Sequence, residues 1–269
     1  MTPLRAVYLD LDGTLLGHGG SLLRDGDGAF SLAGARALEA CHRAGAEVVL
    51  VSGRRRTMLF EDARLLGAGA YAFEAGAGLV VDGETTWLTG PMQPTPDATV
   101  HELIETSGAP ALLLEHFAGR LRHHDPWHLG REVSHLFRGG IDAAEADALL
   151  ARHGHDGLRL LDNGAAREGR VFHLVPKTVS KAGAVAAHMR IRGLAPPESL
   201  AVGDSPEDLA IAGAVGTFWL VANALERDPG LLEAGGRAGA VRIAEAAHGG
   251  GVYEAVMTEL AERRTAGYS

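Results

Sequence analysis

The chain has 269 residues, of which 46% are hydrophobic, and its formal net charge is −9. This length suffices for one large core plus a second module, and the negative charge argues against a nucleic-acid-binding protein, which needs a concentrated basic surface. Cys41 is the single cysteine, which excludes an intramolecular disulfide and favours a reducing compartment. No apolar run approaches ~18 residues and the first strand pattern begins almost at once, so we expect a cytoplasmic protein with neither signal peptide nor membrane span.

The first predicted strand, over residues 4–9, ends at Asp10-Leu11-Asp12-Gly13-Thr14. Two carboxylates at i and i+2 beyond a strand can be aimed at one reacting group, because alternate strand residues share a face. One carboxylate can then attack phosphorus while its neighbour handles protons. The glycine allows a tight turn that brings a backbone N–H close to an anion. Taken alone, the stretch also fits an ordinary strand-ending turn.

The second predicted strand ends in polar residues as well. A glycine-rich stretch over 17–28, expected to form a small flap, and a helix over 30–44 come first. Residues 47–51 then predict a buried strand that ends at Ser52-Gly53-Arg54 and leads into a helix over 54–66. A hydroxyl and free backbone N–H groups at a helix start form an anion site, although a plain strand-to-helix turn gives the same pattern.

A long insertion follows this second motif. Residues 71–73 predict a short strand, and residues 79–83 predict a hairpin with a type I′ turn at Asp82-Gly83. Roughly 130 residues separate Ser52 from Lys181, far more than a crossover connection needs. We therefore expect an inserted α+β domain over residues 84–175. Its predicted helices span 97–106 and 142–153, and its predicted strands span 111–117, 158–161 and 170–175.

Lys181 opens the next predicted helix, over residues 180–192, which Ser180 is placed to cap. A lysine at this point offers a fixed positive charge for a phosphate or for the nucleophile. A solvated helix residue is the alternative for Lys181.

The strand predicted over residues 199–202 ends in carboxylates. Asp204 and Asp208 follow it, within a pattern that predicts a helix over 206–214 and then a strand over 217–221. Acidic oxygen ligands select a hard cation such as magnesium, while a simple helix N-terminus is the alternative for Asp204. Continuous apolar strands that alternate with helices predict an α/β fold with a doubly wound parallel sheet, whose ligands bind at the carboxyl ends of the strands.

These four motifs together resemble those of the haloacid dehalogenase-like (HAD) phosphatases. The matching residues are Asp10/Asp12 with Gly13-Thr14, Ser52-Gly53-Arg54, Lys181, and Gly203-Asp204-Ser205-x-x-Asp208. The resemblance covers residues 1–83 and 176–269, and it implies a Rossmann-like core, magnesium dependence and an aspartyl-phosphate intermediate. An α+β insert of this size at this position resembles the type II cap of the Cof-like sugar phosphatases and mannosyl-3-phosphoglycerate phosphatases.

The resemblance implies a role for each motif. Asp10 is the expected nucleophile and Asp12 the expected acid and base. Phosphate binding falls to Ser52, Gly53 and Lys181. Mg²⁺ is expected to bind Asp10, the main-chain carbonyl of Asp12, and Asp204. Asp208 and Arg54 are expected to support the site, and Asp208 would do so by orienting a metal-bound water or Lys181.

The insert holds the expected substrate-specificity residues. Nine of the thirteen histidines fall within it. A transition-metal site at His123-His124-Asp125 and His128 is disfavoured, because Pro126 argues against a helix that would align these side chains. We expect a subset of six cationic residues to face the cleft and hold a polyol or a second anionic group, with a solvated polar surface as the alternative. The six are Arg120, Arg122, His123, His124, Arg131 and Arg138.

Two residues depart from the family pattern. Glu207 stands where type II members usually carry a phosphate-contacting asparagine, so it either turns away as a helix N-terminal acid or pairs with a cation such as Lys181. Ala75 replaces asparagine in a Glu-Asn-Gly-Ala signature. The expected function is a magnesium-dependent phosphatase of a small phosphorylated metabolite, a sugar phosphate or phosphoglycerate-type ester. A phosphosugar mutase and a non-catalytic phosphometabolite-binding protein are the alternatives.

Overall fold

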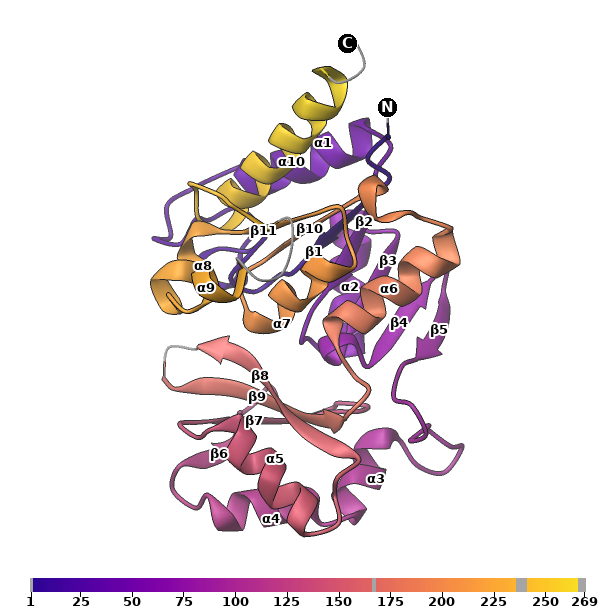
Figure 1. The fold of residues 1–269 in the computed structure, drawn as a ribbon, viewed down its shortest axis with the longest axis vertical. Coiled ribbons are helices and arrows are strands. Elements are labelled where there is room, and N and C mark those ends of the chain that lie inside the picture. The colour runs from indigo at the N-terminus through magenta and orange to yellow at the C-terminus, as the bar shows by residue number, and fades with distance from the viewer. Residues whose placement is uncertain (1, 166–167, 236–240, 266–269) are drawn as a thin grey trace.

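The computed structural model describes residues 2–165, 168–235 and 241–265, and it contains two sheets (Figure 1). The core sheet has eight strands in the order β12-β11-β10-β1-β2-β3-β4-β5, and the insert sheet has four in the order β6-β7-β9-β8. The core strands are β1 (Ala6–Leu9), β2 (Glu47–Val51), β3 (Ala70–Phe73), β4 (Gly78–Val81), β5 (Glu84–Trp87), β10 (Ser199–Gly203), β11 (Thr217–Leu220) and β12 (Val241–Ile243).

Helices cover both faces of the core sheet, which confirms the predicted doubly wound α/β fold. One apolar cluster joins the sheet to α1 (Ala33–Arg43), α2 (Arg56–Leu66) and α10 (His248–Thr265). A second joins its other face to α6 (Lys181–Arg192), α7 (Pro206–Leu209), α8 (Ala222–Arg227) and α9 (Leu231–Gly235). Because both faces are covered, β1 and β10 are buried along their whole length, as continuous apolar strands require.

The core sheet is mixed rather than wholly parallel. Strands β3, β4 and β5 pair antiparallel through the predicted hairpin, where Asp82 and Gly83 have φ values of 52° and 85°. Positive φ at both positions is what a type I′ turn needs. The insertion expected from residue 84 begins later, because β5 is a core strand and the chain leaves the core sheet after Trp87.

The insert unit comprises the insert sheet and three helices. Its elements are α3 (Val100–Thr106), α4 (Ala109–His116), β6 (Leu121–His123), β7 (His135–Gly139), α5 (Ala143–Arg152), β8 (Leu158–Ala165) and β9 (Arg170–Pro176). The strand predicted over 111–117 was wrong, because these residues form most of α4. Leucine and alanine are strong helix formers, and Pro110 lies in the first turn, where proline is tolerated.

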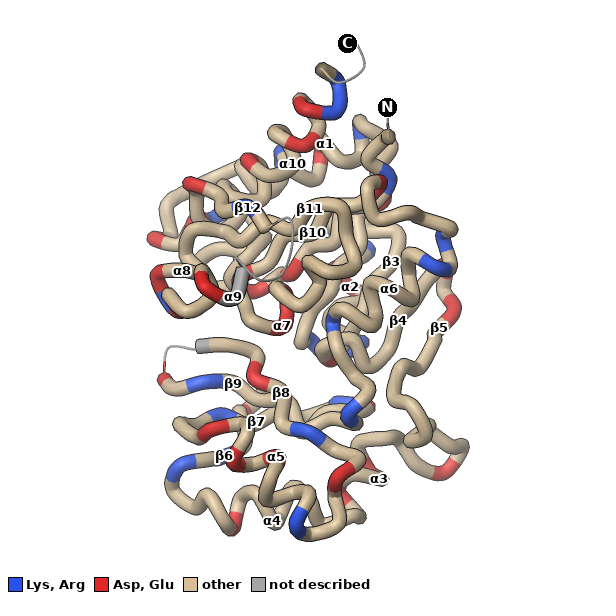
Figure 2. The backbone as a smooth tube through the Cα atoms, in the orientation of Figure 1, with Lys and Arg blue, Asp and Glu red and all other residues tan. Residues whose placement is uncertain are grey.

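The two units carry charges of both signs. Figure 2 shows acidic and basic residues interspersed along the backbone of each. Among the described residues, none of the helices combines the length and apolarity that crossing a bilayer would take.

Candidate active site

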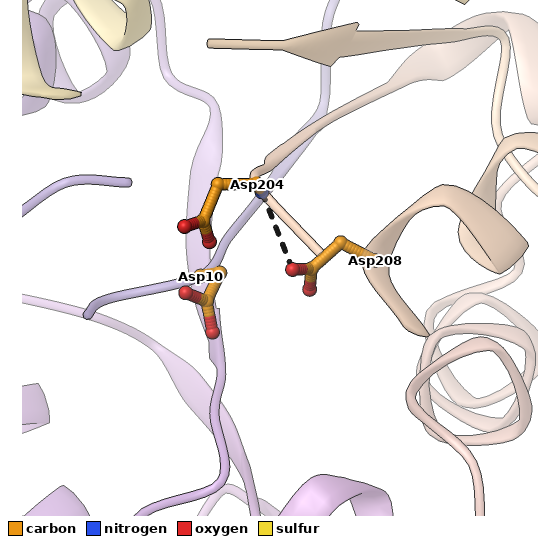
Figure 3. A group of neighbouring side chains, drawn as sticks. All are labelled: Asp10, Asp204 and Asp208. Carbon is orange, nitrogen blue, oxygen red and sulfur yellow. Dashed lines mark hydrogen bonds between the residues drawn. The ribbon is translucent and has the colours of Figure 1, made fainter. Parts of the chain in front are cut away.

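Three parallel strands bring the predicted motifs to one edge of the core sheet. Leu9 of β1 lies in register with Leu50 of β2 and Val202 of β10, so the residues that follow these strands emerge side by side. Figure 3 shows the result for Asp10, Asp204 and Asp208, whose carboxylates gather in one group. One oxygen of each lies within 4.8 Å of the others, although nearly 200 residues separate the first from the last.

Lys181 lies between two of these carboxylates. Its Nζ donates to Asp10 Oδ1 and to Asp208 Oδ1, at 2.7 Å each. The lysine is buried, and burial opposes its charge, but the two carboxylates outweigh burial and raise the pKa of Lys181 above its usual value. The ammonium is therefore a permanent charge that holds Asp10 in one orientation.

Burial disfavours the charged forms of Asp10 and Asp204 and raises the pKa of both carboxyl groups. It raises the pKa of Asp10 well above its ordinary value, and Lys181 offsets only part of that shift. Burial, with Asp208 adding to it, raises the pKa of Asp204 to about 6, against the opposing effects of Arg227 at 2.8 Å and Thr14 at 3.1 Å. Three clustered carboxylates thus exceed the positive charge that the protein supplies to them.

Asp208 is tied to its own helix start as well as to Lys181. Its Oδ2 accepts from the backbone N–H of Ser205 at 3.1 Å and from the Ser205 hydroxyl, which closes a capping box at the start of α7. This fixes the carboxylate that orients Lys181, which was one of the two roles expected of Asp208.

Asp12 and Arg54 form a pair at the mouth of the site. Asp12 is 58% exposed, and both of its oxygens accept from Arg54, at 2.6 and 2.7 Å. Arg54 also donates to Asp62 of α2 at 2.8 Å, which anchors the guanidinium to the core. Arg54 thereby holds the Asp12 side chain from the neighbouring strand end.

Ser52 and Gly53 lie directly under the insert unit. Ser52 is buried, and its Oγ accepts from the backbone N–H of Arg54 at 3.2 Å. A Cβ on Gly53 would lie 2.9 Å from Nε2 of His173 and 3.3 Å from Nδ2 of Asn163, so two insert side chains reach the second motif. Glycine is needed here because of that close approach.

Gly76 sets the backbone position of Lys181, and we expect Gly76→Ala to lower the free energy of unfolding by about 2–4 kcal/mol. Its φ is +92°, and a Cβ there would collide with the backbone oxygen of Ser180. Gly83→Ala is the matched control, because φ is +85° but nothing lies within 4 Å, and it should cost about 1–2 kcal/mol. Urea unfolding of both variants measures the difference, and equal losses would contradict the collision.

A cavity of about 950 Å³ separates the core residues from the insert unit. Its core lining includes all the predicted catalytic, phosphate-binding and metal-binding residues together with Arg54. Those residues are Asp10, Asp12, Ser52, Gly53, Lys181 and Asp204. The insert unit contributes His124, Trp127, Arg131, Asn163 and His173.

Of the four insert residues put forward for specificity, the structure places His124 in the cavity lining. Arg120 lies over the ring of Phe117, 5.1 Å from its centroid, and Arg122 pairs with Glu168 at 3.3 Å. The ring of His123 stacks on another insert histidine, with centroids 4.7 Å apart. Of the two further cations, Arg131 lines the cavity and Arg138 donates to the backbone oxygen of Glu168 at 2.6 Å.

Several residues of the cavity lining were not predicted from the sequence. Asn163 and Trp127 stand in stretches without a motif, and His173 is one of many insert histidines. Arg227 was also missed, because its α8 helix was not assigned. An arginine shortly after the strand that follows the fourth motif was the available signal for Arg227.

The structure also shows where Glu207 points. Its Oε2 lies 3.6 Å from Nη2 of Arg159, a residue of β8 in the insert unit. Glu207 therefore pairs with a cation, which is the second of the two outcomes expected for it, although the cation is Arg159 rather than Lys181.

No second cluster of metal ligands forms in the described part of the insert. Within residues 2–165, 168–235 and 241–265, the one group of three or more His, Cys, Asp or Glu side chains with converging ligand atoms is Asp10, Asp204 and Asp208.

Two phosphatases of known sequence are similar to this chain over most of its length. No family model matches the chain. Over 226 residues it is 29% identical to a phosphoglycolate phosphatase of Methanoculleus marisnigri, covering 82% of this chain and 85% of that protein. It is 27% identical over 232 residues to a phosphoglycolate phosphatase of Methanospirillum hungatei, covering 83% and 86%.

Solved structures share the fold at low identity. The sucrose-phosphatase of Synechocystis sp. PCC6803 superposes with a TM-score of 0.67 at 14% identity, over 96% of this chain and 98% of that one. A subclass IIB sugar phosphatase of the HAD superfamily superposes with a TM-score of 0.62 at 16% identity, over 97% and 99%. The chain thus has the fold of these solved phosphatases, and its four motifs converge on one edge of that fold.

Proposed function

We propose that this protein is a magnesium-dependent phosphatase that hydrolyses a small phosphorylated metabolite through an aspartyl-phosphate. The observation that carries the proposal is the buried Asp10 carboxylate, oriented by Lys181 at 2.7 Å and grouped with Asp204 and Asp208. An oriented carboxylate at the floor of a cavity suits in-line attack on phosphorus. The insert unit, residues 88–176, is proposed as the cap that provides substrate specificity.

The donor set fits a magnesium ion. Its members are carboxylates, which Mg²⁺ prefers to nitrogen or sulfur ligands, and their excess negative charge calls for a divalent cation. We assign the ion to Asp10, the main-chain carbonyl of Asp12 and Asp204. When bound, it offsets the negative charge that would otherwise repel a phosphate from these acids.

The residues of the chain then divide the reaction between them. An oxygen of Asp10 forms a bond to phosphorus as the ester P–O bond breaks, and Asp12 gives a proton to the leaving alkoxide. Asp12 next takes a proton from the water that attacks the aspartyl-phosphate, which releases inorganic phosphate and restores Asp10. Ser52, the Gly53 N–H and Lys181 bind the equatorial phosphoryl oxygens, where charge is greatest in the transition state.

The proposed substrates are phosphate esters with a small polar leaving group. The cavity of about 950 Å³ has room for a sugar phosphate or a phosphoglycerate-type ester. Phosphoglycolate, the substrate in the names of the two curated relatives, belongs to the same size class.

A phosphate-release screen tests the proposal. We expect at least one ester among sugar phosphates, phosphoglycerates, phosphoglycolate and nucleotides to release phosphate with Mg²⁺ present, and EDTA to abolish the release. Tight binding of a ligand without release from any ester would favour a binding protein. Isomer formation from a sugar 1-phosphate without free phosphate would favour a mutase.

The same assay has an expected pH dependence. Because burial raises the pKa of Asp204 to about 6, protons compete with the metal for this ligand below that pH. The Mg²⁺ concentration that gives half-maximal activity should therefore rise as the pH falls from about 7.5 to 5.5. A constant requirement over this range would argue against Asp204 as a ligand.

A further inference from the structure

A chain of three buried polar side chains links the core to the cavity wall. Glu74, at the end of β3, accepts from the Ser134 hydroxyl at 2.9 Å through its Oε2. The same hydroxyl lies 3.1 Å from Nδ1 of His173 on β9. All three residues are buried. Glu74 belongs to the core unit, whereas Ser134 and His173 belong to the insert unit.

The surroundings of Glu74 fix the direction of the first hydrogen bond. Its two oxygens accept from the backbone N–H groups of residues 132, 133 and 134, at 2.8, 3.2 and 2.7 Å. Three backbone donors suit an ionised carboxylate, which can only accept hydrogen bonds. At 2.9 Å from such an oxygen, the Ser134 hydroxyl has to use its one hydrogen to donate to Glu74.

The tautomer of His173 follows from this direction. Having given its hydrogen to Glu74, the Ser134 oxygen accepts from Nη1 of Arg131 at 3.1 Å and from the His173 ring at 3.1 Å. Nδ1 of His173 therefore carries the hydrogen, and Nε2 holds a lone pair. Burial, together with Arg131 and Lys181 nearby, lowers the pKa of His173 well below its ordinary value, so a second proton on the ring is disfavoured.

Nε2 is the ring atom that faces the phosphate-binding motif. A Cβ on Gly53 would lie 2.9 Å from it, and His173 lines the cavity beside Ser52 and Lys181. Among the described residues, Nε2 has no hydrogen-bond partner in the protein. A neutral acceptor is thus fixed on the cavity wall next to the place where the ester is cleaved.

We propose that Nε2 of His173 accepts a hydrogen bond from a hydroxyl group that the substrate carries close to its phosphate ester. The inference rests on the proposed phosphatase function and narrows its substrate class to phosphate esters of polyols, sugars and hydroxyl-bearing acids. Glycolate has no hydroxyl once its oxygen is esterified, and a carboxylate oxygen facing Nε2 would place two acceptors together. Asn163, which lies beside His173, does not discriminate in this way because its amide both donates and accepts.

Matched pairs of esters test this selectivity. 2-Phosphoglycerate and 2-phospholactate differ by one hydroxyl, and propane-1,2-diol 1-phosphate and propyl phosphate form a second pair that differs by one hydroxyl. The kcat/KM of the wild-type protein should be about 3- to 10-fold higher for the hydroxyl-bearing member of each pair. The sign of this preference is the first result that supports or overturns the inference.

Two variants remove the acceptor by different routes. In His173→Phe, the kcat/KM values of the two esters of each pair should differ by less than about 2-fold. Ser134→Ala keeps the imidazole ring but removes the hydroxyl that fixes its tautomer, so its preference for the hydroxyl-bearing ester should be intermediate. This variant provides the test if His173→Phe does not fold. His123→Phe is the control, because it changes an insert histidine whose ring stacks on another histidine outside the cavity lining, and it should keep the wild-type preference.

The outcomes separate this inference from the proposed function. An unchanged preference in folded His173→Phe overturns the inference, and so does an equal loss for both members of a pair, which would place His173 on the phosphoryl group. The same pairs are titrated calorimetrically into Asp10→Asn with Mg²⁺ present. If the wild type releases no phosphate, the proposed function fails, and the calorimetric preference for the hydroxyl still supports or overturns the inference.

Discussion

Asp10→Asn is expected to lower kcat for phosphate release by at least about 10⁴-fold, because the amide cannot form the proposed aspartyl-phosphate. The substitution is nearly isosteric, and Lys181 keeps its second partner, Asp208, at 2.7 Å. The loss should therefore reflect chemistry rather than folding. Phosphate release under saturating Mg²⁺ measures the effect, and thermal unfolding checks that the variant is folded.

Asp12→Asn is the informative companion to that variant. It removes the proposed acid and base but leaves the main-chain carbonyl that we assign to the metal, so Mg²⁺ affinity should change little while kcat falls by about 10²- to 10⁴-fold. Asp10→Asn should weaken Mg²⁺ binding as well. A kcat for Asp10→Asn within about tenfold of the wild-type value would rule out Asp10 as the nucleophile.

The core of this site could be predicted from the sequence because each motif directly follows an apolar strand. Parallel strands that end in register bring such residues to one edge, and the register of Leu9 with Leu50 and Val202 does so here. Spacing along the chain and strand periodicity thus carry enough information to bring Asp10, Ser52 and Asp204 together.

The insert unit was harder to predict because its site depends on side-chain direction and distant pairing. His123 ends β6 and His124 follows it, and neighbours along an extended strand point to opposite sides. The sequence therefore indicates that one of them faces the cleft without indicating which. The apolar run in α4 was ambiguous for a similar reason, since a short run has no measurable period.

Contacts between distant segments were beyond prediction altogether. Arg159 meets Glu207 because β8 packs against α7, and Ser134 meets His173 because β7 pairs with β9. Nothing in the local sequence of Glu207 or His173 encodes these partners. The departure of Glu207 from the family pattern was visible, but its ion-pair partner, Arg159, lies 48 positions away in another element, as the difference between 207 and 159 shows.

Lys181→Met should lower the free energy of unfolding of the metal-free protein by about 3–5 kcal/mol near neutral pH. Met fills the same volume but leaves Asp10 and Asp208 buried and facing each other without a cation. Urea unfolding in EDTA measures the loss. Lys177→Met is the control, because Lys177 is the only other lysine, is exposed, and should change stability by less than about 0.5 kcal/mol.

The sign of the pH dependence identifies the cause of that loss. Burial already raises the pKa of Asp10, and the variant lacks the ammonium that offsets the shift, so the folded pKa lies further above the unfolded value. A carboxyl group of this kind favours the folded state where it is protonated and disfavours it as the pH rises through its folded pKa. The stability gap between Lys181→Met and the wild type should therefore narrow as the pH falls from about 8 to 5. A gap that widens instead would mean that Lys181 stabilises the fold through packing, and that the buried carboxylates do not need its charge.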